Sequence, residues 1–366
     1  MMYSLDEIGL IPAEVSTVKH RADVHPFVQS PFGGEKLPVF VAPMTCILNA
    51  NNICTFSQSK VEPILPVCSG ELELRIQLPN GSDWQGWAAV TLQEFDYLFN
   101  QAKVPANKPY YILIDVANGH MSEMYEMVKH AKDLYSRLTV MIGNIANPMT
   151  YIDCCKARVD YVRVGIGGGA GCTTSVQTGI HASMPWLLTE IKRHKVFMKM
   201  YEEYNEIDKE SIRKNLGWTY GGIGDFRTKI VADGGINTIA KAIKCLALGA
   251  DYVMMGKCFA ECEEGTTHEI WYKDPTSNGR IFVPHHLYYG QSSEEGQKDR
   301  FGKAKSNPEG VSKWIPVTTN LSEFCGKFEA ALRSAMSYCN ASTLNDFIGK
   351  VKYETMTHSE FDAYIK

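Results

Sequence analysis

The sequence predicts an α/β fold of the (β/α)8 TIM-barrel type. Eight short apolar runs recur along its 366 residues, and helical patterns follow several of them. The runs are apolar on both faces, which suits the strands of a buried parallel sheet better than those of a half-exposed antiparallel sheet. One strand with its helix takes roughly 25 residues, so repeated units of this kind predict a closed barrel.

The expected strands and helices follow one another in a regular order. The strands are residues 37–44, 64–70, 86–92, 110–119, 139–148, 161–169, 228–235 and 251–258. Helices are expected over 120–133 and 147–157, near Pro185, and in "TIAKAIKCLALGA", where Ile239, Ala242, Ile243 and Leu246 have helical spacing. Gly249 supplies the end of that last helix.

Two long segments interrupt this rhythm. An insertion at about 196–226 follows the sixth strand, and a flap at about 289–315 follows the eighth. Before the flap, "DPTSNGR" is typical of a hairpin turn. We expect one catalytic domain over residues 1–366, with the flap as a lid over the strand ends.

Composition narrows the class of function. The chain is 45% hydrophobic and has a formal net charge of -4 without long like-charge runs. Neither nucleic acid nor an anionic membrane is therefore an expected partner. No signal peptide or long apolar span is visible, so we expect a cytoplasmic protein. The 11 cysteines form no CxxC pair, which excludes a zinc ribbon or a disulfide framework.

The sixth expected strand runs into "VGIGGGAGCTT", which presents Cys172 at the carboxyl end of the barrel. Glycines permit φ > 0 and leave backbone groups free to converge on a ligand. Converging N–H groups lower a thiol pKa, so Cys172 is a candidate nucleophile with Thr173 and Thr174 beside it. The alternative is a glycine-rich turn with an incidental cysteine.

The seventh and eighth strands end in "ADGGI" and "MMGKC". Barrels often hold a phosphate at these two loops, a task that suits Gly234, Gly235, Gly256 and Lys257. Asp233 could accept the paired hydroxyls of a ribose. Its alternative role is the N-cap of the following helix. Phosphate, diol and thiol together describe a nucleotide whose base lies over Cys172.

Seven motifs resemble those of the inosine monophosphate dehydrogenase and guanosine monophosphate reductase family. They are "IDVANGH", "VGIGGGAGCTT", "IVADGGI", "DYVMMGKCFA", "YYGQSS", "NPEG" and "LRSAMSYC". The resemblance covers about residues 37 to 345. It implies that the loop cysteine attacks C2 of a purine, and that a nicotinamide exchanges hydride with the same carbon.

By this resemblance Cys172 is the nucleophile, while Thr174 and Glu309 handle protons. Taken alone, Glu309 in a flap would be a solvated charge. The nucleotide would be bound by Asp233, Gly234, Gly235, Gly256, Lys257, Gly290, Gln291, Ser292 and Gly310. The cofactor, NADPH or NAD, would contact Asp115, Val116 and Ala117, and a neighbouring subunit of a homotetramer would supply Arg21, Ser334 and Ser337. Backbone carbonyls of Gly167, Gly169 and Cys172 would hold K+.

Several features favour the reductase, which converts GMP to IMP with NADPH and releases ammonia. No room exists between Leu65 and Ala88 for the paired regulatory (CBS) modules that the dehydrogenase commonly carries there. "IDVANGH" and "YYGQSS" also resemble the reductase forms. "KDRFG" is similar to the dehydrogenase's water-activating Arg-Tyr pair, but Phe301 has no hydroxyl. The alternatives are an IMP dehydrogenase without these modules, a nucleotide-binding barrel that has lost its chemistry, and a flavin-dependent barrel.

The sequence also departs from the family pattern. Ala170 and Ser175 stand where a serine and an arginine are usual, and Lys257 replaces a second glycine. Thr45 occupies the place of an aspartate, and Cys68 and Ser69 replace a His-Lys pair that helps to hold the cofactor. These positions concern phosphate binding and cofactor choice.

Overall fold

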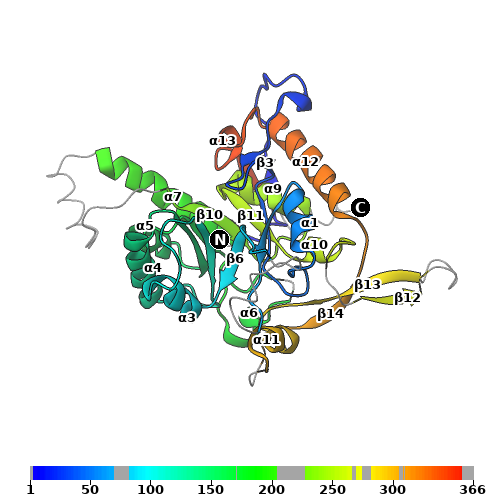
Figure 1. The fold of residues 1–366 in the computed structure, drawn as a ribbon. Coiled ribbons are helices and arrows are strands. Elements are labelled where there is room, and N and C mark those ends of the chain that lie inside the picture. The colour runs from blue at the N-terminus through cyan, green and yellow to red at the C-terminus, as the bar shows by residue number, and fades with distance from the viewer. Residues whose placement is uncertain are drawn as a thin grey trace.

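The barrel is seen in a computed structural model that describes residues 3–69, 82–169, 171–203, 227–265, 269–273, 282–304, 308 and 310–356. Its strands form a closed parallel barrel in the order β10-β11-β4-β5-β6-β7-β8-β9, which confirms the predicted fold (Figure 1). The strands are β4 (Val39–Val41), β5 (Glu62–Leu65), β6 (Trp87–Val90), β7 (Tyr110–Asp115), β8 (Leu138–Ile145), β9 (Tyr161–Val164), β10 (Lys229–Asp233) and β11 (Tyr252–Met255).

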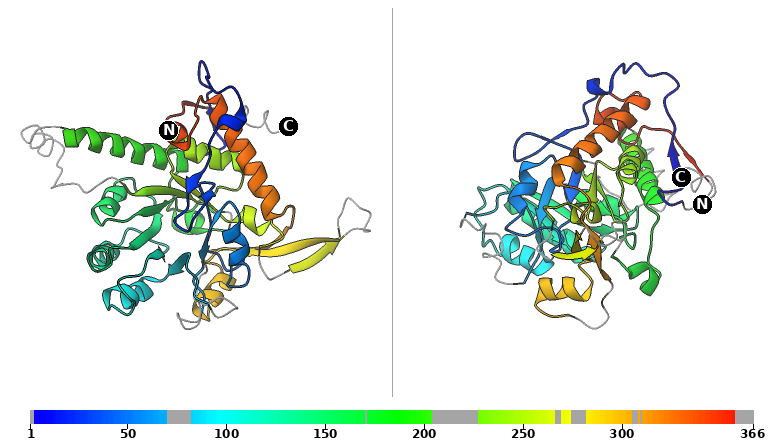
Figure 2. Two further views of the ribbon diagram at one scale, coloured as in Figure 1. Left: turned by 45° about the horizontal axis from the view of Figure 1, so that its top comes forward. Right: turned by 90° about the vertical axis from the view of Figure 1, so that its right-hand side faces the viewer.

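Helices cover the outside of the barrel (Figure 2). They are α1 (Ile53–Gln58), α3 (Leu92–Phe95), the π-helix η2 (Asp96–Asn100), α4 (Ser122–Leu134), α5 (Thr150–Lys156), α7 (Met184–Glu203), α9 (Ile239–Leu248), α10 (Lys257–Ala260), α12 (Leu321–Tyr338) and α13 (Leu344–Phe347). Helix α9 begins at the N-cap Thr238, whose side chain accepts a hydrogen bond from the Lys241 amide, and ends at Gly249 with φ of 123°. The predicted end of this helix is confirmed.

The barrel interior follows the period-two alternation of its strands. One set of side chains packs inside the barrel, including Phe40, Trp87, Leu113, Met141 and Val231. The intervening residues pack outward against the helices, as Ile112 and Ile114 of β7 do. A charged residue two positions beyond an inward-facing apolar one therefore lies at the end of the barrel.

A three-stranded antiparallel sheet stands beside the carboxyl end of the barrel strands. It comprises β12 (Glu269–Lys273), β13 (Phe282–Tyr289) and β14 (Ser312–Pro316), and helix α11 (Glu294–Phe301) follows β13 (Figure 1). Trp271 pairs with Pro284, so the predicted hairpin joins β12 to β13, although its turn at 274–281 lies outside the described residues. The flap thus contains a helix and a strand.

The remaining elements lie near the two ends of the chain. They are β1 (Ile8–Leu10) with β15 (Tyr353–Thr355), β2 (Val28–Gln29) with β3 (Glu35–Lys36), and the 3-10 helix η1 (Arg21–Asp23). The pairing of β1 with β15 joins the two ends. Helix α7 continues to Glu203, so the first part of the predicted insertion prolongs a barrel helix. Residues 204–226 lie outside the described part. Among the described helices, none is both long and apolar enough to span a membrane.

Candidate active site

A chain of four alternating charges lies at the mouth of the barrel. Strand alternation places Asp115 of β7, Arg163 of β9 and Asp233 of β10 two residues beyond inward-facing Leu113, Tyr161 and Val231. Arg163 Nη1 lies 2.6 Å from Asp115 Oδ1, and Arg163 Nη2 lies 2.7 Å from Asp233 Oδ2. Arg300 of α11 extends the chain, with its Nη1 2.9 Å from Asp115 Oδ2.

These ion pairs determine the ionisation of Asp115. The side chains of Asp115 and Arg163 are 4% and 9% exposed. Burial by itself would raise the Asp115 pKa, but Arg163 and then Arg300 hold it below its ordinary value. Sequence reasoning had singled out Asp115 and Asp233 but missed Arg163. The available signal was an arginine at an inward position of the apolar strand "YVRVG".

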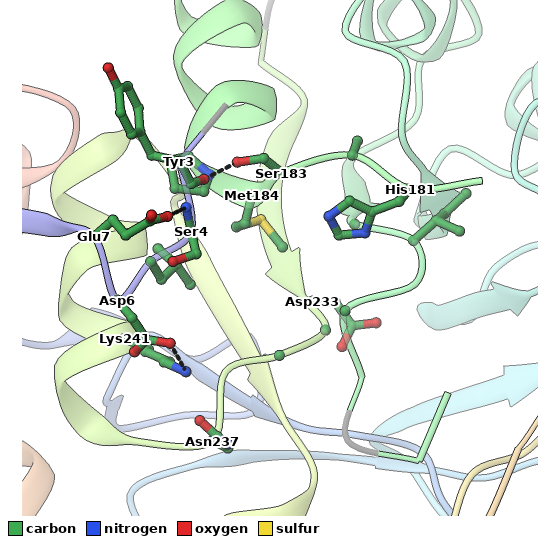
Figure 3. A pocket seen from close by; sticks show the side chains of 18 residues that line it. Tyr3, Ser4, Asp6, Glu7, His181, Ser183, Met184, Asp233, Asn237 and Lys241 are labelled. Atoms are coloured by element: carbon green, nitrogen blue, oxygen red, sulfur yellow. Dashed lines mark hydrogen bonds and ion pairs between the residues drawn. The ribbon is translucent and has the colours of Figure 1, made fainter. Parts of the chain in front are cut away.

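One carboxylate oxygen of Asp233 accepts hydrogen bonds from neighbouring side chains. Asp233 also lines a cavity. Arg163 Nε and Nη2 and the amide of Asn144 all donate to Asp233 Oδ2, the last at 2.8 Å. The cavity has a volume of about 460 Å³ and is lined by Asp233, Gly234, Gly235 and Gly168 together with residues 3–7 and 181–185; Cys172 is not among its lining residues (Figure 3). Because Thr238 caps α9, Asp233 does not serve as the N-cap.

The cysteine loop packs directly on the Asp233 turn. A Cβ on Gly235 would lie 2.8 Å from the Gly168 carbonyl oxygen, so only glycine fits this approach. Gly235 also has φ of +75°, in the left-handed region. The thiol of Cys172 donates to Thr174 Oγ1 at 3.2 Å, at the first residue of the short helix α6 (Thr174–Thr178).

The flap closes on the same loop through backbone contacts. Cys172 forms an isolated antiparallel bridge with Gly310, and the Val311 amide donates to the Gly171 carbonyl at 3.1 Å. Gly290, at the end of β13, lies so close to Gly171 that a Cβ on it would be 3.0 Å from the Gly171 oxygen. Gly290 and Gly310 therefore stand beside the Cys172 loop, and their binding of a nucleotide stays a prediction.

Helix α11 is fastened to the barrel mouth at two neighbouring residues. Asp299 accepts hydrogen bonds from the hydroxyls of Thr45 at 2.6 Å and Tyr289 at 2.5 Å. Arg300 binds Asp115 and also donates to Gln291 Oε1 at 3.3 Å. Its Nε is a buried donor without a hydrogen-bond partner in the described part of the chain.

Other predicted substrate contacts surround this region. Gly256 lies at the start of α10, where a Cβ would be 3.0 Å from the sulfur of Met44. The ammonium of Lys257 is paired with Glu261 at 2.7 Å. Gln291 donates to the Pro43 carbonyl, and the Ser292 carbonyl accepts from Gln297 at 3.1 Å.

The expected cofactor residues fall into two groups. Val116 pairs with β8, where its amide donates to the Gly143 carbonyl at 3.3 Å, and Ala117 follows it in the same segment as Asp115. Arg21 lies in η1, which packs on α12, the helix that carries Ser334 and Ser337. The end of α12 that bears these serines is far from α11 (Figure 1). One chain does not bring the two groups together.

Two predicted roles, proton transfer by Glu309 and the K+ site of the Cys172 loop, lie wholly or partly outside the described residues. Glu309 and Ala170 are not among the described residues. The Gly167 carbonyl accepts from Ser175 at 3.2 Å and the Gly169 carbonyl from the Cys172 amide at 3.0 Å. Among the described residues each oxygen accepts this one hydrogen bond, and its second lone pair is compatible with a monovalent cation. Within the described ranges, no cluster of His, Cys, Asp or Glu could hold a metal ion.

A model of the IMP dehydrogenase / GMP reductase domain matches residues 85–195 and 221–363. The chain belongs to this family. An inosine-5'-monophosphate dehydrogenase of Chlorobaculum tepidum is 32% identical over 258 residues, which cover 67% of this chain and 45% of that protein. A GMP reductase of Clostridium acetobutylicum is 26% identical over 367 residues, and one of Bacillus licheniformis is 27% identical over 370; both matches cover 99% of this chain and 98% of the relative.

The two kinds of relative differ in how much of them is matched. The matched region spans about half the length of the dehydrogenases. The reductase alignments extend over nearly the full length of both proteins. Both kinds of relative share this domain with the chain.

Proposed function

We propose that this protein is a purine nucleotide oxidoreductase that reduces GMP to IMP with NADPH and releases ammonia. The observation that carries the proposal is the packing of three loops at one barrel mouth. The Cys172 loop contacts the Asp233 turn through Gly168 and the flap through Gly310. The proposed nucleophile, the proposed diol acceptor Asp233 and the flap thus belong to loops that contact one another at the place where barrels keep their active sites.

The nucleotide is oriented from its ribose and phosphate. Asp233 accepts the ribose hydroxyls with the oxygen that Arg163 and Asn144 leave open. The amides of Gly234, Gly235 and Gly256 and the ammonium of Lys257 receive the phosphate. With the ribose held in this way, C2 of the base comes to Cys172, as proximity catalysis requires.

Cys172 then acts as the nucleophile. Its sulfur forms a bond to C2 of guanine, the exocyclic amine leaves as ammonia after taking up a proton, and hydride adds to C2 as the sulfur departs. NADPH supplies that hydride. Thr174, 3.2 Å from the sulfur, receives the thiol proton and passes it on.

We assign Glu309 to the protonation of the departing amine. Its described neighbours support this: Gly310 pairs with Cys172, and the Pro308 carbonyl accepts from Gln177 of α6 at 3.3 Å. Val116 and Ala117 follow Asp115 beside the cofactor.

The cofactor's remaining contacts call for a second chain. Arg21, Ser334 and Ser337 lie together but away from the mouth, so we propose that they serve the site of a neighbour in a homotetramer. K+ on the carbonyls of the Cys172 loop would hold that loop in position. A cytoplasmic location agrees with this chemistry.

The second candidate is an IMP dehydrogenase that oxidises IMP with NAD. The 32% identity to the Chlorobaculum tepidum enzyme favours it. The full-length match to reductases and the short span between Leu65 of β5 and Trp87 of β6 favour the reductase.

Turnover distinguishes the two candidates. The purified protein should consume NADPH with GMP and release one ammonia per NADPH. Formation of NADH from IMP and NAD, with no reaction of GMP, would establish the dehydrogenase instead. No turnover in either direction, together with no nucleotide protection of Cys172 from alkylation, would leave a barrel without this chemistry.

A further inference from the structure

The guanidinium of Arg300 is packed into the barrel mouth. Its guanidinium lies 2.9 Å from Asp115 Oδ2 and its side chain is 13% exposed. The adjacent Asp299 fixes the same turn of α11 through Thr45 and Tyr289, and the Ser69 amide donates to the Asp299 carbonyl at 2.5 Å. The contacts of the neighbouring Asp299 therefore help to hold Arg300 against Asp115.

The charges of this cluster sum to zero. Asp115 and Asp233 contribute two negative charges, and Arg163 and Arg300 contribute two positive ones. The side chains of Asp115, Arg163 and Asp233 are at most 15% exposed, so solvent screens their charges only weakly. Without Arg300, the buried cluster would carry a net negative charge that attracts a cation. Arg300 therefore weakens the attraction of this region for a cation, and the adjacent Asp299 carboxylate, held by Thr45 and Tyr289, is a further negative charge of the same turn.

The two redox states of the cofactor differ in this respect, because an oxidised nicotinamide ring carries a positive charge and a reduced ring is neutral. On the proposed function, this ring lies beside Asp115. We propose that Arg300 is a specificity residue that makes the site prefer the reduced nicotinamide over the oxidised one. The inference rests on the proposed function and explains how the site favours delivery of hydride and release of the oxidised product.

The test compares dissociation constants of NADPH and NADP+ in a Cys172→Ser background saturated with GMP, where no turnover disturbs the titration. Arg300→Gln should lower the ratio of the NADP+ constant to the NADPH constant by on the order of tenfold, because a nearby like charge is removed. Arg300→Lys keeps the charge and should keep the ratio. Lys298→Gln, on the exposed side of the same helix, is the matched control and should leave the ratio unchanged.

Two results would overturn the inference. One is an unchanged ratio in Arg300→Gln, including the case in which both constants tighten equally because Arg300 only obstructs the site. A ratio in Arg300→Lys that falls as far as in Arg300→Gln would show that packing, not charge, matters. If instead neither cofactor binds and the wild-type protein does not turn over GMP, the proposed function itself fails and the inference falls with it.

Discussion

Replacing Arg163 by methionine tests the charge chain that organises the barrel mouth. The change removes contacts from Arg163 to Asp115 at 2.6 Å and to Asp233 at 2.7 and 3.1 Å. Each charge-assisted hydrogen bond contributes about 1.5–3 kcal/mol. Asp115 keeps Arg300 and Asp233 keeps Asn144, which offsets part of the loss. We expect the free energy of unfolding to fall by about 3–5 kcal/mol at pH 7, the usual range for breaking a buried ion pair.

The pH dependence follows from Asp115. Its pKa in the folded protein is depressed, so its ion pairs stabilise the wild type above the unfolded pKa of about 3.9, and this stability is lost as the pH falls through the folded pKa. In Arg163→Met, burial of Asp115 is less compensated and its pKa rises. The stability difference between the two proteins should therefore narrow between pH 7 and pH 4.

Urea denaturation at both pH values measures the effect. Arg193→Met is the control, because Arg193 is 75% exposed and pairs with Glu190 within one helix. Its effect should stay within about 0.5 kcal/mol. The reasoning would be refuted if Arg163→Met cost no more than the control, or if its cost grew as the pH fell.

Other predictions concern the sulfur and the flap. Cys172→Ser should abolish GMP-dependent NADPH consumption while GMP binding, measured by calorimetry, is retained; retained turnover would contradict the assigned nucleophile. Peptide mapping after iodoacetamide treatment at pH 7.5 should show GMP-protected labelling of Cys172 and none of Cys46, whose pKa burial raises to about 12; labelling of both alike would argue against a special site. Gly310→Ala should reduce turnover at least tenfold, because its Cβ would lie 2.7 Å from the Ser293 amide nitrogen. Gly326→Ala, in open space on α12, should keep activity and raise stability by about 0.5–1 kcal/mol; equal loss in both variants would contradict the steric account.

Local patterns were sufficient to predict the barrel. Apolar runs of strand length, the helical spacing from Ile239 and the stop at Gly249 each reflect contacts within one element. The glycine loop before Cys172 was also visible, because close backbone approach demands glycine in the sequence itself.

Pairings between distant segments were not predictable in this way. Nothing near Asp299 indicates that it binds Thr45, and nothing near Arg300 indicates Asp115, because these contacts depend on how α11 docks on the barrel. Arg163 was overlooked for a similar reason: its partners lie on two other strands. A polar side chain at an inward strand position is the sequence signal that indicates such a pairing between strands.

The most direct test of the account is a crystal structure of the Cys172→Ser protein with GMP. The account predicts the base over residue 172, the ribose hydroxyls on Asp233 and the phosphate at the Gly235 and Gly256 turns. A nucleotide bound elsewhere, or a base whose C2 lies out of reach of residue 172, would contradict it.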